Sequence, residues 1–142
     1  MPWPGDQVWS QGSGDTLSRE TTRAGSKAWP WPEALDALVA APDYHQLLFE
    51  NERVRVLDVR IGPGHIVPVH THKWPGIIQV RSASDFIRRD GDGKLLFDSR
   101  DASPADKAPA IIWTDSMPPH SVENIGGAEI HLVSVEIKPV IA

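Results

Sequence analysis

Residues 63–76, PGHIVPVHTHKWPG, contain three of the six histidines of the chain. His70 and His72 are separated by a single residue, and side chains two apart in a β-strand point to the same face of the sheet. Their imidazoles can therefore reach one metal ion together. The alternative interpretation is a solvated polar strand end, and a metal site needs a third ligand from another part of the chain.

His120 is the residue that best supplies this third ligand. It follows two prolines, whose fixed backbone angles make the entry to the next strand rigid. Asn124 lies four residues further on, just before a glycine turn at residues 126–127. The chain has no cysteine, so thiolate metal sites and disulfides are excluded and the ligands must be histidines or carboxylates.

Most of the remaining chain shows the pattern of short strands separated by turns. Its 142 residues include 13 prolines and 11 glycines, which favours an all-β domain over a helix bundle. Alternating apolar residues and turn signals predict eight or nine strands within residues 44–138, including a hairpin at residues 84–100. A short helix is predicted at about residues 32–41. This pattern indicates a sandwich or a double-sheet jelly roll.

The two ends of the chain differ in character. Residues 1–28 are rich in Gly, Ser, Thr and charged residues, and we expect them to form a flexible N-terminal arm. In the alternative interpretation, Trp3 and Trp9 dock on the body of the protein or on a partner subunit. Residues 29–142 are expected to form the single folded domain.

Composition excludes several classes of partner. The net charge is −5 and no basic stripe is present, which argues against nucleic acid. No window approaches the roughly 20 apolar residues of a membrane span, and the N-terminus has no apolar core of the signal-peptide kind. We therefore expect a cytoplasmic protein whose partner is a small molecule.

The two histidine segments carry a family resemblance. Gly64, five further residues and the His70-Thr71-His72 triplet resemble the first motif of the cupin family, and residues 118–124 resemble the second. The resemblance covers about residues 44–138. It implies an all-β cupin jelly-roll β-barrel with the short helix and the extended arm outside it, and a metal ion bound by His70, His72 and His120. A homodimer, usual in small cupins, is also implied.

One departure from the family pattern matters for the site. The glutamate of the first motif should fall at Gly76 or Ile77, and neither side chain can bind a metal. Three interpretations remain open. The site uses three histidines, as in some cupin dioxygenases with iron(II); or Gln79 fills the gap, although strand alternation turns it outward; or the metal has been lost and the barrel binds a ligand without one.

These alternatives lead to different functions. Three neutral imidazoles would leave a divalent ion its full charge and three open positions, which suits a chelating, anionic substrate. The resemblance favours a metal-binding cupin, with a small-molecule dioxygenase using Fe(II) as the leading activity; Zn, Ni, Mn and Cu also accept imidazole. The alternatives are a non-catalytic cupin that binds a small ligand as sensor or carrier, a metal-dependent isomerase or lyase, and a purely structural zinc.

Five further residues are predicted to line a substrate pocket, each with an alternative. Trp74 walls the pocket or belongs to the core. Arg88 faces inward and holds a carboxylate if Phe86 faces inward, or else is solvated. His131 lies in the barrel as an acid, base or fourth ligand, or is a buried, hydrogen-bonded histidine. Gln79 and Asn124 complete the set.

The other two histidines are not expected in the site. His45 is predicted to lie outside the barrel. His65 is predicted to be a surface residue or to sit at the mouth of the pocket.

Overall fold

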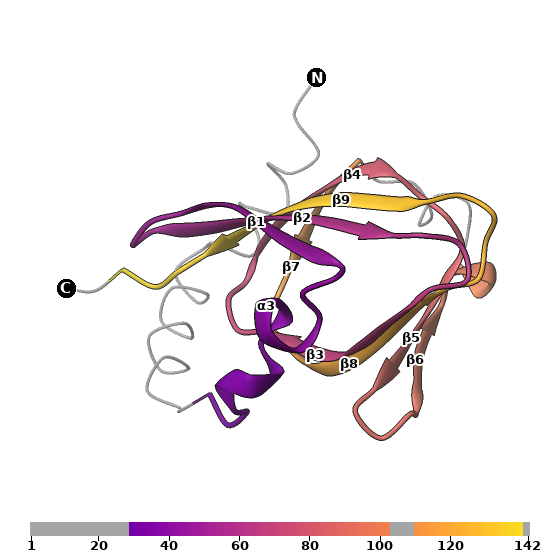
Figure 1. The fold of residues 1–142 in the computed structure, drawn as a ribbon, viewed down its shortest axis with the longest axis horizontal. Coiled ribbons are helices and arrows are strands. Elements are labelled where there is room, and N and C mark those ends of the chain that lie inside the picture. Colours follow the sequence, from indigo (N-terminus) through magenta and orange to yellow (C-terminus); the bar gives the residue numbers. More distant parts are fainter. Residues whose placement is uncertain (1–28, 103–109, 141–142) are drawn as a thin grey trace. The chain divides into compact units, whose positions relative to one another are not determined.

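Nine β-strands form two antiparallel sheets in the computed structural model, which describes residues 29–102 and 110–140 (Figure 1). The predicted N-terminal arm and most of the loop before residue 110 lie outside the described residues. The helices and strands of the described residues belong to the compact unit that begins at Trp31. The all-β jelly-roll fold is thereby confirmed.

Each sheet is assembled from strands that are distant in sequence. The five-stranded sheet has the order β1-β2-β9-β4-β7, and its strands are β1 (His45–Glu50), β2 (Val54–Ile61), β9 (Ile130–Ile137), β4 (Gly76–Ser82) and β7 (Ile111–Thr114). The four-stranded sheet has the order β3-β8-β5-β6, and its strands are β3 (Ile66–His72), β8 (Met117–Asn124), β5 (Phe86–Asp90) and β6 (Leu95–Asp98).

The helical segment before β1 is divided in two. The predicted continuous helix is instead a 3-10 turn, η1 (Glu33–Leu35), followed by a short α-helix, α3 (Ala37–Ala40). The residue between them, Asp36, is extended, and its carboxylate accepts a hydrogen bond from the Leu38 amide. It therefore acts as an N-cap, which ends one turn and starts the next. A second 3-10 turn, η2 (Ser99–Asp101), follows β6. None of the described helices is long and apolar enough to cross a membrane.

The core lies between the two sheets and is concentrated at one end. Alternation along β2 turns Leu57, Val59 and Ile61 inward, where they are buried with Val67 of β3 and Ile130 of β9. The fourth inward position of β2 is Arg55, which is also buried. One end of the interior is thus apolar, and the other contains charged groups.

The two motif segments contact each other at the end of the β3–β8 ladder. Gly64 has a φ of +80°, a conformation that glycine adopts readily and other residues avoid. Its amide donates to the Asn124 carbonyl over 2.9 Å, and the Asn124 amide donates to the His65 carbonyl over 3.0 Å. These bonds hold the first end of the ladder, and the register then shifts between Val67 and His70 and again between His70 and His72.

Candidate metal centre

Four histidines from three strands meet inside the barrel; we refer to His45, His70, His72 and His120 as the four-histidine cluster. His45 begins β1, two rings come from β3 and one from β8. The β3–β8 register sets His70 opposite His120, and their ring centroids are 4.4 Å apart. The other centroid distances are 4.8 Å for His45–His70, 5.0 Å for His70–His72, 5.3 Å for His45–His72 and 5.8 Å for His72–His120.

All four rings are held by a hydrogen bond at Nδ1. The partner is a carbonyl or carboxylate oxygen, which can only accept, so Nδ1 carries the hydrogen; in a neutral ring Nε2 then keeps its lone pair. This is the tautomer that a metal ligand needs when it binds through Nε2. The bonds join His45 to the Ala41 carbonyl (2.9 Å), His70 to the Pro68 carbonyl (2.7 Å), His72 to Glu136 Oε2 (2.7 Å) and His120 to the Pro118 carbonyl (2.8 Å).

Burial keeps three of these rings neutral. It lowers the pKa of His45 and His120 to about 4. Burial, together with repulsion from the neighbouring imidazoles, lowers the pKa of His70 to about 2. Because a metal ligand must offer an unprotonated nitrogen, this environment suits metal binding at neutral pH.

The spacing of the rings fits a single ion. The ligand atoms of His45, His70 and His72 all lie within 4.8 Å of one another. Two imidazole nitrogens on opposite sides of an ion bound at about 2.1 Å are about 4.2 Å apart. These three rings could therefore hold one divalent ion after side-chain adjustment; His120 is not one of this group, but its ring lies beside that of His70.

A buried carboxylate, that of Glu136, is hydrogen-bonded to one ring of the cluster. Glu136 of β9 accepts from His72 Nδ1 through Oε2 and from Arg55 Nε through Oε1, the latter over 2.6 Å. Arg55 in turn donates two bonds of 2.9 Å to the Asp36 carboxylate. Burial alone would raise the pKa of Glu136, but the bonds from His72 and Arg55 outweigh it, so the pKa is lowered and the carboxylate is charged. Such a partner orients a ligating imidazole and raises its basicity.

The structure explains why no glutamate occupies the motif position. Gly76 pairs with Glu136 across the β4–β9 ladder, and a Cβ on Gly76 would collide with the Val135 carbonyl. Ile77 stands at the position between inward-facing Gly76 and Ile78, so it points away from the cavity. The carboxylate near the site therefore comes from β9 and acts through His72.

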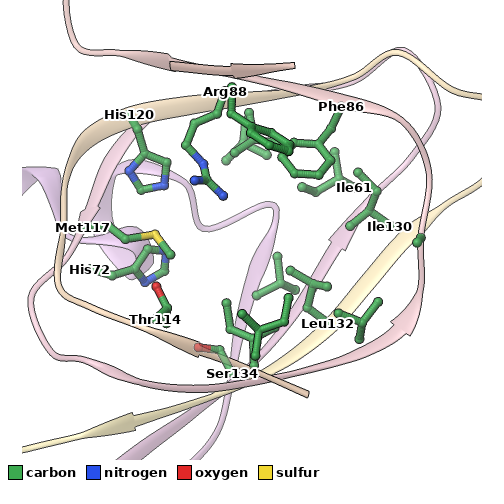
Figure 2. Close-up of a pocket in the computed structure, with 18 of the residues that line it drawn as sticks. Ile61, His72, Phe86, Arg88, Thr114, Met117, His120, Ile130, Leu132 and Ser134 are labelled. Carbon is green, nitrogen blue, oxygen red and sulfur yellow. The ribbon is translucent and has the colours of Figure 1, made fainter. Parts of the chain in front are cut away.

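A cavity of about 600 Å³ extends from the four-histidine cluster into the apolar end of the barrel. Figure 2 shows His72 and His120 on one side of this cavity and Ile130 and Leu132 on the other. A polar end and an apolar end are typical of sites for small organic molecules, which are commonly several hundred Å³ in volume.

Two of the predicted pocket residues line this cavity. Trp74 does so, and its ring also contacts cations, with Arg55 Cζ and Lys138 Nζ each 5.1 Å from the centroid. Arg88 lines the cavity together with Phe86, so the inward of the two alternatives for Arg88 is the one observed.

The other three predicted pocket residues do not line the cavity. Alternation turns Gln79 outward, where it is exposed. The side chain of Asn124 is buried in the turn after β8, where it donates to the carbonyls of Ile61 (2.9 Å) and Ala128 (2.8 Å).

Of the two alternatives for His131, the structure shows the hydrogen-bonded histidine, half-buried and outside the cavity. Its inward-facing neighbours on β9 are Ile130 and Leu132, and His131 points away from the cavity, with Nε2 2.7 Å from Asp58 Oδ1. The parity was ambiguous in the sequence because both faces of β9 carry apolar residues.

His45 was placed wrongly, since it is buried and belongs to the cluster. A β-bulge between Leu47 and Phe49 shifts the β1–β2 register by one residue, so that His45 pairs with inward-facing Val59. Without the bulge, counting back from the Glu50–Arg55 pair at the β1–β2 turn would place His45 opposite Arg60, which faces outward. His65 is exposed, as one alternative held, and its Nδ1 is 3.2 Å from the Tyr44 hydroxyl.

Comparison with known proteins bears on the fold. No family model matches the chain, and no curated protein matches it. A cupin domain from Bordetella pertussis Tohama I aligns over 67% of this chain and 92% of its own, with 20% identity and a TM-score of 0.51. An RmlC-like cupin family protein with a double-stranded β-helix fold, from Methanocaldococcus jannaschii, covers 66% of this chain and 78% of its own at 13% identity and a TM-score of 0.48. An RmlC-like cupin protein from Desulfovibrio desulfuricans covers 78% and 95%, at 18% identity and a TM-score of 0.42.

The buried carboxylate generates a prediction about stability. We expect Glu136→Gln to lower the free energy of unfolding by about 3 kcal/mol, because it removes one of the two negative charges that compensate buried Arg55. Chemical denaturation measures this loss. The control is Glu123→Gln, which breaks a partly exposed ion pair with Arg89 and should cost less than about 1 kcal/mol. Equal losses in the two variants would contradict the structural role of Glu136.

Proposed function

We propose that this chain, which has the cupin fold, binds one divalent transition-metal ion at the four-histidine cluster and acts there on a small organic molecule. The observation that supports this most is that all four rings are hydrogen-bonded at Nδ1. Each is anchored through Nδ1, and three are held neutral by burial, so their Nε2 lone pairs are available to one ion.

The proposed ligands are His70, His72 and His120, with His45 as a fourth. An iron(II) ion held there would supply the Lewis acidity and redox chemistry of a dioxygenase, the activity that the family resemblance implies. The chain's own residues hold the rings in place, with Glu136 fixing His72 and backbone carbonyls fixing the other three. The apolar end of the cavity excludes water from the region where the substrate would lie.

Metal binding is tested on protein purified without a histidine tag. We expect about one equivalent of a transition metal by elemental analysis. His70→Ala and His72→Ala should each lower the affinity at least about 100-fold, because each removes a ligand. His131→Ala is the matched control, because this ring is bonded to Asp58 away from the cavity, and its metal content should be unchanged.

The same assay identifies the remaining ligands. Comparing His45→Ala with His120→Ala shows whether the ion uses one or both of these rings. Native protein that takes up no transition metal, or a loss in His131→Ala equal to that in His70→Ala, would rule out the proposed centre.

Oxygen uptake tests the proposed activity. We expect iron(II)-loaded protein to consume O₂ when a β-diketone or an aminothiol is added, and the His70→Ala variant to consume none above background. An oxygen electrode measures this directly. Bound metal without oxygen uptake would contradict the dioxygenase activity and favour a metal-dependent isomerase or lyase. A ligand that binds the native protein and His70→Ala equally would favour the sensor or carrier instead.

We also propose that two copies of the chain pair along β1. This strand forms one edge of its sheet and exposes Leu47, Leu48 and Phe49, whose exposed fractions are 44%, 51% and 54%. An apolar edge strand is a template for antiparallel pairing with a second copy about a two-fold axis.

Light scattering on the full chain tests this pairing. We expect a dimer for the native protein and a monomer for Leu48→Lys, because a charge on this edge opposes strand pairing. Leu96→Lys, on the exposed edge strand β6 of the other sheet, should remain a dimer. A monomeric native protein, or a dimer that Leu48→Lys leaves intact, would contradict the proposal.

A further inference from the structure

Arg88 is a half-buried cation that forms no hydrogen bond or ion pair within the described part of the chain; its Cζ lies 5.8 Å from the centroid of the Phe86 ring. It stands on β5 beside Phe86, and Figure 2 shows its guanidinium projecting into the cavity between His120 and Phe86. Its Nε is the one buried side-chain nitrogen or oxygen among the described residues that has no hydrogen-bond partner. It takes part in none of the ion pairs formed by residues 29–102 and 110–140.

Two other arginines show that this is not the general rule in the fold. Arg89, the next residue, faces the other side of the sheet and pairs with Glu123 over 3.1 Å. Arg55 is buried, and three hydrogen bonds join it to Asp36 and Glu136. The described residues therefore supply a carboxylate to each of these two guanidinium groups and none to Arg88.

The carboxylates that line the cavity are already engaged. Asp85 accepts from the Ser99 hydroxyl over 2.7 Å, and Glu136 is bonded to Arg55 and His72. Burial lowers the pKa of Arg88, and no nearby carboxylate opposes that shift. A guanidinium remains charged under these conditions, so the free chain carries a positive charge at the cavity that no carboxylate of the described residues pairs with.

The rest of the cavity limits what can neutralise this charge. Arg88 and the four-histidine cluster form its polar end, and Ile61, Ile130 and Leu132 lie toward its apolar end (Figure 2). A planar guanidinium matches a carboxylate in a two-point hydrogen-bonded pair. A hydrocarbon body would replace water against the aliphatic side chains.

We propose that Arg88 is an anion-binding residue and that the cavity takes a small organic acid, with its carboxylate on the guanidinium and its hydrocarbon part against Ile61, Ile130 and Leu132. This proposal adds a class of ligand, small organic acids, to the proposed function. It rests on the proposed function in one respect only, which is that the carboxylate would lie beside the metal centre. Arg88 binds the acid whether or not an ion is present.

Calorimetric titration with hexanoate tests the assignment, using hexan-1-ol as the neutral probe of similar length. The protein is the full chain, both loaded with zinc and stripped of metal, after removal of the chelator. We expect the native protein to bind hexanoate at least tenfold more tightly than hexan-1-ol in both forms. Arg88→Leu should lose this preference, and Arg89→Leu, the matched control on the opposite face, should keep it.

A second readout separates ligand binding from a structural role. Because the buried Nε of Arg88 has no hydrogen-bond partner, Arg88→Leu should melt at the same temperature as the native protein or higher. Hexanoate should raise the melting temperature of the native protein and not that of Arg88→Leu. Arg88→Gln provides a second neutral variant with the same expected loss of preference. Hexanoate binding that is unchanged in both Arg88 variants would overturn the assignment.

The two proposals fail in different ways. A native protein that binds no metal, yet binds hexanoate only when Arg88 is present, would refute the metal centre and support the anion site. A native protein that binds metal but does not distinguish hexanoate from hexan-1-ol would support the metal centre and refute the anion site.

Discussion

The antiparallel pairing of β3 with β8 is the constraint on which the rest of the site depends. It brings together histidines that are about fifty residues apart in sequence and sets His70 directly opposite His120. The hydrogen bonds between the Gly64 and Asn124 segments hold the far end of the ladder, and the register shifts between Val67 and His70 before the histidines pair. A slip of one residue would turn each imidazole to the opposite face of the sheet. The convergence of the rings is therefore a property of strand register and of the positive φ that Gly64 allows.

The interior treats its charged groups in two ways. Arg55 and Glu136 compensate each other, with Asp36 as the third member, and this chain of hydrogen bonds ends at the ring of His72. Arg88 has no such compensation. A buried ion pair whose hydrogen bonds are all made helps to hold the surrounding elements in place. A charge withdrawn from water without a counter-charge is destabilising unless a bound ligand neutralises it. The contrast distinguishes a scaffold group from a ligand-binding group.

Much of the fold could be predicted from the sequence because its signals are local. Alternation along β2, the hairpin between β5 and β6 and the glycine turn before β9 are each contained within a few residues. The motif pair that predicted His70, His72 and His120 is likewise read from short spacings. Local signals of this kind indicate which elements form and which residues share a strand face.

The errors arose where non-local contacts decide the outcome. A bulge in β1 turned His45 inward, and nothing in the residues around Leu48 signals it. The inward face of β9 could not be chosen because both faces are apolar, so the two alternatives for His131 stayed open and Glu136 was overlooked. The carboxylate was sought beside the histidines in sequence, but it reaches His72 from a strand of the opposite sheet.

The double role of Asp36 sets the shortest form in which this domain can be studied. Its carboxylate caps α3 and also binds both terminal nitrogens of Arg55, although it precedes the first strand of the barrel. A truncation that starts at β1 would keep every strand and every histidine, yet it would remove half of the negative charge that meets Arg55. The helical lead-in is thus an integral part of the barrel wall, and the N-terminal limit for any trimmed version lies before residue 36.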